Sequence, residues 1–188
     1  MRFDTLLKGG HLIDPKNNVN APMDLAITDG KIAAIDQDIP ADQAQQVLDV
    51  TGLYITPGLV DIHTHMYATP GWANAWAGDN SILPDGFSFR SGVTTMVDTG
   101  SAGWRTFPDF RERVLTRFQT RMYAFINIAS MGMVSTDLEQ NVSDMDVERT
   151  AAVMKEHSDF VVGSKTAHFK SPDWVSTDRA LASGRAAG

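Results

Sequence analysis

The sequence lacks several features that would each indicate a particular class of protein. It contains no cysteine, so it has no disulfide framework, and any metal ion must be held by nitrogen and oxygen ligands. No apolar run reaches the roughly 18 residues of a membrane span, which predicts no contact with a membrane. No basic run accompanies the net charge of −7, which argues against binding to nucleic acid.

A secretory signal is also missing from the sequence as given. Lys8 and Gly9-Gly10 interrupt the apolar part of the N-terminal segment, and no small-residue cleavage site follows it. A cytoplasmic location is therefore the default prediction. The 188 residues are 43% hydrophobic and 21% charged, which is ordinary for a globular protein with a real core.

Residues 1–55 are predicted to form a small β-rich domain. Asp29-Gly30 separates two β-type runs, 24–27 and 31–35, and this pattern is a strong hairpin signal. Gly9-Gly10 is expected to break an earlier strand over 3–13. We expect short antiparallel strands in a small sheet or half sandwich, which carries no site motif.

Residues 56–188 alternate between strand-like and helix-like segments. Such alternation predicts a parallel sheet with right-handed crossovers, in either an open doubly wound sheet or a (β/α)8 barrel. No Gly-x-Gly-x-x-Gly follows the first strand, which argues against a dinucleotide site. The expected strands are 59–62, 94–99, 122–129 and one beginning at 160–162; the expected helices are 85–91, 106–118 with Thr106 as N-cap, one following a Ser143–Asp146 capping pattern, and 175–187.

Two histidines follow the first of these strands. His63 and His65 are two residues apart, so in a strand they lie on one face, and Asp61 shares it. Both imidazoles would then point at one place at the carboxyl end of the strand, where both of these folds put their sites. This is the geometry of metal ligands, and zinc, iron or manganese would suit it.

Three segments resemble the amidohydrolase superfamily, in particular its dihydroorotase-like branch: residues 56–65 with Asp61-Ile62-His63-Thr64-His65, residues 92–103, and residues 162–165. The second, with 107–111 and 124–128, looks closest to the amidohydrolase/deacetylase metallohydrolases. The resemblance implies a β-sandwich-like domain (residues 1–55) beside a metal-dependent hydrolase (β/α)8 TIM barrel, of which residues 56–188 hold the first four βα units.

The resemblance also implies a site with two divalent metals, most readily zinc. His63 and His65 would bind the more buried metal, and Lys165, N-carboxylated by carbon dioxide, would bridge both. The reaction would be hydrolysis of a C–N bond in an amide or cyclic amide, or deacetylation of an N- or O-acyl compound. His168 and Trp72 are candidates for contacts with a small-molecule substrate, although an exposed histidine and a buried loop anchor are equally good interpretations. Asp98 is expected in a structural hydrogen bond.

The length sets a limit on this interpretation. A whole barrel takes about 250 residues, so we expect an N-terminal fragment that lacks later ligands, is inactive alone, and forms a homo-oligomer or associates with the missing half. One alternative is a non-catalytic amidohydrolase-like scaffold or binding protein. Another is an α/β protein of unrelated function with a chance His-x-His.

Overall fold

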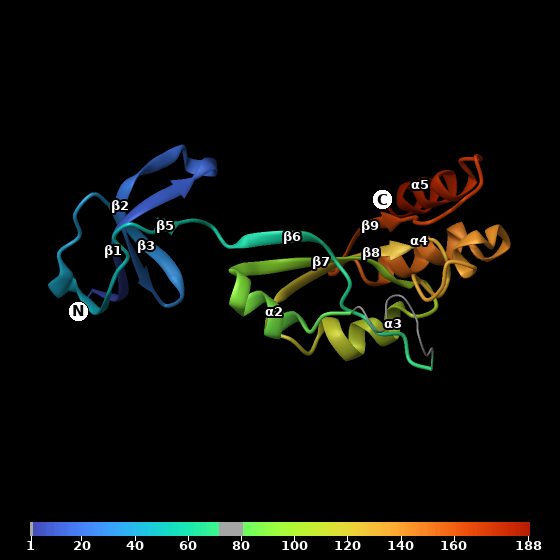
Figure 1. The fold of residues 1–188 in the computed structure, drawn as a ribbon, viewed down its shortest axis with the longest axis horizontal. Coiled ribbons are helices and arrows are strands. Elements are labelled where there is room, and N and C mark those ends of the chain that lie inside the picture. Colours follow the sequence, from blue (N-terminus) through green and yellow to red (C-terminus); the bar gives the residue numbers. More distant parts are fainter. Residues whose placement is uncertain (1, 72–80) are drawn as a thin grey trace. The chain divides into compact units, whose positions relative to one another are not determined.

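The computed structural model describes residues 2–71 and 81–188 (Figure 1). The chain divides into two compact units, Met1–Pro57 and Gly58–Gly188, and each is described by itself. Among the described residues, no helix is long and apolar enough to cross a membrane.

The first unit contains a five-stranded sheet. Its order is β3-β2-β1-β4, and β5 pairs with β1 beyond the end of β4. The Asp29-Gly30 hairpin is confirmed, because β2 and β3 flank it and pair antiparallel. The elements are β1 (Phe3–Asp14), η1 (Pro15–Asn17), β2 (Val19–Thr28), β3 (Lys31–Asp36), η2 (Ala41–Gln43), β4 (Ala44–Asp49) and β5 (Tyr54–Ile55).

Two expectations for this unit are wrong. Strand β1 runs on through Gly9-Gly10, where a bulge shifts its register against β2. The chain tolerates this bulge because the Gly9 N–H donates to the Asp24 carboxylate (2.8 Å) instead of to a neighbouring strand. In addition, β4 and β5 pair with β1 in parallel, whereas the expected sheet was antiparallel.

Asp24 is a buried carboxylate that ties three segments of the first unit together. It accepts hydrogen bonds from Lys8 Nζ (2.8 Å), Gly9 N (2.8 Å) and Ile39 N (2.9 Å). Burial alone would raise the pKa of Asp24, but these hydrogen bonds outweigh burial and hold the pKa below its usual value. The carboxylate therefore stabilises the unit in its ionised form.

The second unit contains a four-stranded, wholly parallel sheet in the order β6-β7-β8-β9, which confirms the predicted βα alternation (Figure 1). Its core gathers around Met96, Phe107, Phe110, Ala124 and Ile126, all fully buried. The elements are β6 (Leu59–Thr64), α2 (Pro84–Ser91), β7 (Val93–Gly103), α3 (Phe107–Phe110), η3 (Arg111–Leu115), β8 (Arg121–Asn127), η4 (Leu138–Gln140), η5 (Val142–Asp144), α4 (Val147–Glu156), β9 (Val161–Lys165) and α5 (Val175–Ala187).

Two helix starts differ from the predictions. Thr106 makes no capping bond to α3; its hydroxyl oxygen accepts from Gly103 N (3.1 Å), and after Phe110 the helix continues as the π-helical segment η3, which ends at Leu115. Helix α4 begins after Asp146, whose carboxylate accepts from Arg149 N (2.9 Å), whereas Ser143 lies in the preceding turn η5.

The two outer strands of this sheet expose apolar side chains. In β6, Leu59, Val60 and Ile62 are 56%, 58% and 69% exposed, and in β9 Val162 is 52% exposed. Each is an edge strand within the described sheet, so one row of its backbone polar groups has no neighbouring strand there. These edges are suited to contact with further protein.

Candidate metal site

The polar residues of the candidate site lie where the parallel strands end. His65 directly follows β6, Ser101 lies two residues before the end of β7, Asn127 ends β8 and Lys165 ends β9. Because all four strands run in the same direction, these residues meet at the carboxyl end of the sheet. The fold thus brings together residues separated by up to about a hundred positions in the sequence.

The rings of His63 and His65 lie beside one another. Their centroids are 5.6 Å apart, with an angle of 72° between the ring planes. Two imidazoles that each place a nitrogen about 2.1 Å from one tetrahedral zinc ion have ring centroids roughly 5 Å apart. The observed spacing is therefore close to that of two ligands on one ion.

The strand argument for this pair needs one correction. Pairing between β6 and β7 is irregular between Asp61 and Thr64, and β6 ends before His65. His63 is therefore exposed and His65 half-buried, rather than equivalent on one face. The Asp61 carboxylate accepts a hydrogen bond from the backbone N–H of His63 (3.0 Å), which fixes the backbone just before the two rings.

A buried aspartate orients His65 through a serine. Asp98 is fully buried and accepts from Met66 N (2.7 Å) and Ser101 N (2.8 Å), so the predicted structural role is what the geometry provides. Burial raises the pKa of Asp98 to about 6, although these backbone hydrogen bonds and the Ser101 hydroxyl lower it. Ser101 Oγ lies 2.9 Å from His65 Nδ1. Since the hydroxyl donates to Asp98, it accepts from Nδ1–H, and the lone pair of His65 is on Nε2.

The electrostatics of His65 suit a metal ligand. Burial, followed by the charges of His63, Lys165 and His168, lowers the pKa of His65 to about 4. The imidazole is therefore neutral at physiological pH, which is the form that binds metal. The same interactions show that Lys165 and His168 lie near His65.

Lys165 is held against Gly100, a glycine of β7 in the same sheet. Gly100, at φ +89°, leaves no room for a side chain, because an added Cβ would lie 2.7 Å from Lys165 Cγ and 3.0 Å from Lys165 Cβ. The lysine stem thus packs directly on the β7 backbone. The sequence predicted Lys165 at the end of the fourth strand of this unit, and that strand, β9, does end at Lys165.

His168 contacts a residue that sequence reasoning missed. Its Nδ1 lies 2.8 Å from Glu139 Oε2, and the Glu139 side chain is only 3% exposed. Glu139 also accepts from Asn127 Nδ2 (3.2 Å). No motif indicates Glu139, which lies in η4 between β8 and α4 and meets His168 only through the fold.

The loop after β6 holds Tyr67 and also Trp72, which was predicted as a substrate contact or as a buried loop anchor. Trp72 lies outside the described residues, so this prediction stays open. Tyr67 is 1% exposed, packs on Phe110 with ring centroids 5.0 Å apart, and donates its hydroxyl to Asp109 Oδ2 (2.7 Å). Tyr67 is therefore a loop anchor.

The side chains of the site fit a metal ion in part. Within residues 2–71 and 81–188, no three His, Cys, Asp or Glu side chains come together as a metal cage. The two imidazoles have suitable spacing, and His65 is in the neutral form. Lys165 adds a useful ligand only as an anionic carbamate, because an ammonium group has no lone pair.

Comparisons with known proteins identify relatives along most of the chain, although no family model matches it. A deacetylase of Agrobacterium fabrum is 35% identical over 153 residues, which cover 78% of this chain and 35% of the relative. An allantoinase of Escherichia coli is 39% identical over 101 residues, which cover 52% of this chain and 20% of the relative. The crystal structure of a dihydroorotase matches with a TM-score of 0.76 and 28% identity over 96% of this chain and 48% of that one.

The coverage of these relatives is unequal. The chain spans about a third of the length of the curated deacetylases that it matches first, and about half of the dihydroorotase structure. The match to the dihydroorotase covers residues of both units.

Proposed function

Because the chain belongs to the amidohydrolase superfamily, as the segments around His63, His65 and Lys165 predict, we propose that it supplies the first half of the active site of a metal-dependent hydrolase. The bond cleaved is the C–N bond of an amide or cyclic amide, or the acyl bond of an N- or O-acetyl compound. The observation that carries the proposal is the pair of imidazoles 5.6 Å apart, with His65 neutral and near Lys165.

In this proposal His63 and His65 would hold a divalent ion, most readily zinc, and Lys165 in its N-carboxylated form would be a further ligand. Bound ions of this kind supply Lewis-acid polarisation of a carbonyl and acidify water. The residues of this chain prepare the site for them. Asp98 and Ser101 hold the proton of His65 on Nδ1, and Gly100 lets the Lys165 stem lie against β7.

The substrate is a small molecule, and His168 contacts it. His168 is 43% exposed, lies three residues after Lys165 and is held by Glu139. We keep Trp72 as a second candidate on sequence grounds alone. The deacetylase and the allantoinase differ in the linkage that their names imply, so both open-chain acyl compounds and cyclic amides belong in the first substrate panel.

The remaining half of the barrel is proposed to contact the exposed edges of the sheet. Leu59, Val60 and Ile62 of β6 and Val162 of β9 are the apolar side chains that such contact would cover. Relatives two to three times longer than the matched region support continuation of the same fold. In isolation the chain is expected to form a homo-oligomer or to bind the missing half.

Zinc titration of three proteins tests the site. Wild type should bind zinc, the double variant His63→Ala, His65→Ala should lose that binding, and His11→Ala should behave as wild type, because His11 is in the first unit and bonds to Asn20. Equal zinc affinity in the double variant and wild type would refute the assignment of these ligands.

Carbon-13 NMR in labelled bicarbonate tests the lysine. A carbamate signal should appear with zinc present and vanish in Lys165→Met, but persist in Lys155→Met, which removes an exposed lysine of α4. Hydrolysis is then assayed on the full-length protein that contains this chain. Zinc binding and carbamate without hydrolysis of any amide in the panel would favour the scaffold alternative.

A further inference from the structure

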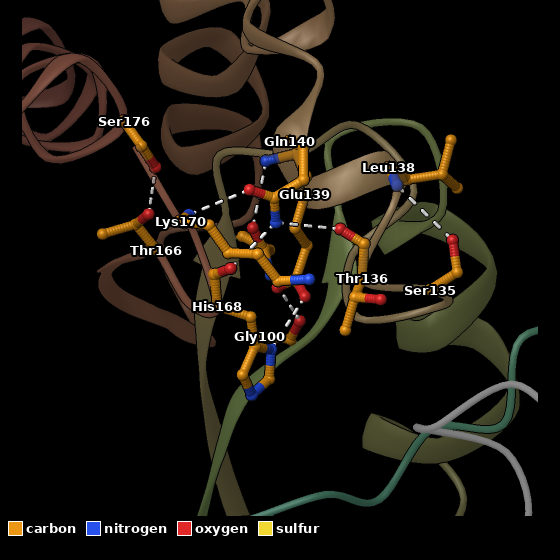
Figure 2. Close-up of polar contacts among 12 residues, drawn as sticks. Gly100, Ser135, Thr136, Leu138, Glu139, Gln140, Thr166, His168, Lys170 and Ser176 are labelled. Carbon is orange, nitrogen blue, oxygen red and sulfur yellow. Dashed lines mark hydrogen bonds and ion pairs between the residues drawn. The ribbon is translucent and has the colours of Figure 1, made fainter. Parts of the chain in front are cut away.

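A buried carboxylate beside the proposed site remains unused by the function described so far. The Glu139 side chain is 3% exposed and has two partners, Asn127 Nδ2 at Oε1 and His168 Nδ1 at Oε2. Figure 2 shows Glu139 beside His168. Its pKa is raised by burial, although the hydrogen bonds from His168 and Asn127 and the charge of Lys165 lower it. A carboxylate kept in such a place needs both partners as donors.

Three hydrogen bonds fix the orientation of the Asn127 amide, so its oxygen and nitrogen cannot exchange places. Its Nδ2 donates to Gly100 O (3.3 Å) and to Glu139 Oε1 (3.2 Å), and its Oδ1 accepts from Ala129 N (3.0 Å). Whatever residue stands at position 139 therefore meets an N–H donor on the Asn127 side. This fixed donor determines which atom of that residue faces His168.

The loop that carries His168 is clamped at two further points. Gln140 Nε2 donates to His168 O (2.8 Å), and Gln140 Oε1 accepts from Lys170 N (2.9 Å), as Figure 2 shows. His168 itself has φ +54°, a left-handed backbone conformation that costs a non-glycine residue energy. Adjacent residues 139 and 140 thus fix both the ring and the backbone of His168.

We propose that Glu139 is a positioning residue that holds the His168 proton on Nδ1, so that Nε2 presents a lone pair as hydrogen-bond acceptor to an N–H or O–H of the substrate. A carboxylate has no proton to donate, so its partner nitrogen must carry one. This inference rests on the proposed function only for the identity of what His168 contacts. The tautomer itself follows from the contacts of Glu139.

The substitution Glu139→Gln separates this role from simple packing. It preserves the shape of the side chain but replaces one acceptor oxygen with an NH2 donor. Asn127 Nδ2 still requires an acceptor, so the new amide oxygen takes the Oε1 position and the amide NH2 faces His168. That NH2 can only donate, so His168 Nδ1 must give up its proton and Nε2 must take it. The expected result is inversion of the tautomer without loss of the contact.

Long-range nitrogen-15 NMR of the imidazole rings measures the tautomer directly. The chain has five histidines, and the His168 signals are identified by their loss in His168→Gln. Spectra are recorded well above the ordinary imidazole pKa of about 6.5, where the neutral ring dominates. We expect Nδ1–H in wild type, Nε2–H in Glu139→Gln, and Nδ1–H in Glu148→Gln, which makes the same change at an exposed position of α4.

The wild-type spectrum decides the inference even if Glu139→Gln fails to fold, because an Nε2–H tautomer of His168 in wild type overturns it. A folded Glu139→Gln protein that keeps Nδ1–H overturns it as well. Zinc added to the same wild-type sample tests the proposed function separately, through the signals of His63 and His65. Absence of any zinc response with His168 as Nδ1–H refutes the metal site and leaves the role of Glu139 supported.

In the full-length enzyme the two variants should also differ in kinetics. Glu139→Gln should lower kcat/KM by about tenfold or more for substrates that donate a hydrogen bond to Nε2, since donor would then face donor. Glu148→Gln should leave kcat/KM unchanged. Equal kcat/KM for wild type and Glu139→Gln would overturn the proposed substrate contact.

Discussion

Gly100 offers the sharpest test of how Lys165 is positioned, because the glycine and the lysine stem touch. In Gly100→Ala the new Cβ would lie 2.7 Å from Lys165 Cγ and 3.0 Å from Lys165 Cβ. The Cβ of Lys165 is fixed to its strand, so Cγ must move by rotation about χ1, which carries Nζ to a different staggered position. The substitution therefore displaces the proposed lysine ligand without altering the identity of any proposed ligand.

The energetic cost has two parts that a second glycine separates. At φ +89° an alanine costs about 1–2 kcal/mol from its backbone alone, and crowding in a packed interior adds about 1–3 kcal/mol. Gly92 caps α2 at φ +71° with no atom within 4 Å of an added Cβ. Gly92→Ala should therefore cost only the backbone part, about 1–2 kcal/mol.

Tryptophan fluorescence during urea unfolding measures these costs in the second unit alone. All four tryptophans lie after residue 57, so unfolding of the first unit gives no tryptophan signal of its own. Gly100→Ala should be less stable than Gly92→Ala by about 1–3 kcal/mol. In bicarbonate, its zinc affinity should fall by about tenfold or more, while Gly92→Ala binds as wild type.

Two results would contradict this reasoning. If Gly100→Ala and Gly92→Ala lose equal stability, the lysine stem is free to move and the contact carries no energy. If Gly100→Ala is less stable but binds zinc and forms the carbamate as wild type does, the position of Lys165 in the metal-free chain does not prepare it as a ligand.

Three further substitutions test other parts of the structure. Asp24→Asn should destabilise the first unit by about 1–3 kcal/mol, measured by amide hydrogen exchange in β1 and β2. The lowered pKa of Asp24 means that its stabilisation is full above the unfolded value of about 3.9 and is lost as pH falls through the folded value, so the variant should lack this acid sensitivity. Ser101→Ala should weaken zinc binding about tenfold by releasing His65 Nδ1, measured by competition with a chelator. Tyr67→Phe should cost about 1 kcal/mol in urea unfolding through loss of the bond to Asp109, with zinc affinity unchanged.

The parts of the fold that sequence predicted correctly are those with a local cause. The Asp29-Gly30 hairpin, the parallel strands and the helix over 175–187 follow from turn chemistry and hydrophobic period. The errors occur where a distant contact replaces the local preference. Gly9 stays within β1 because Asp24 takes its N–H, and Thr106 bonds to Gly103 instead of capping α3.

In the candidate site, too, the sequence indicates residues that belong to a local motif and misses those that only distant contacts bring together. His63, His65 and Lys165 could be proposed from the sequence because their motif is short and each stands at the end of a predicted strand. Glu139 could not, because it meets His168 across 29 positions of sequence and its place in the short turn η4 matches no site motif. Ser101 lies within residues 92–103, which carry part of the family resemblance, but its contact with His65 depends on how β7 places it in the fold.

These missed residues suggest why the site can be specific before any ion or substrate arrives. In the proposed arrangement the buried carboxylates of Asp98, through the Ser101 hydroxyl, and of Glu139, directly, each place an imidazole proton on Nδ1. Both arrangements leave the lone pair on Nε2, in His65 for the proposed metal and in His168 for the proposed substrate donor. An imidazole already fixed in one tautomer and orientation loses less entropy on binding than one that exchanges between two. Binding is therefore stronger even though no contact is added. The substitutions Ser101→Ala and Glu139→Gln therefore test one principle at two positions, and zinc affinity should respond to the first while the His168 tautomer responds to the second.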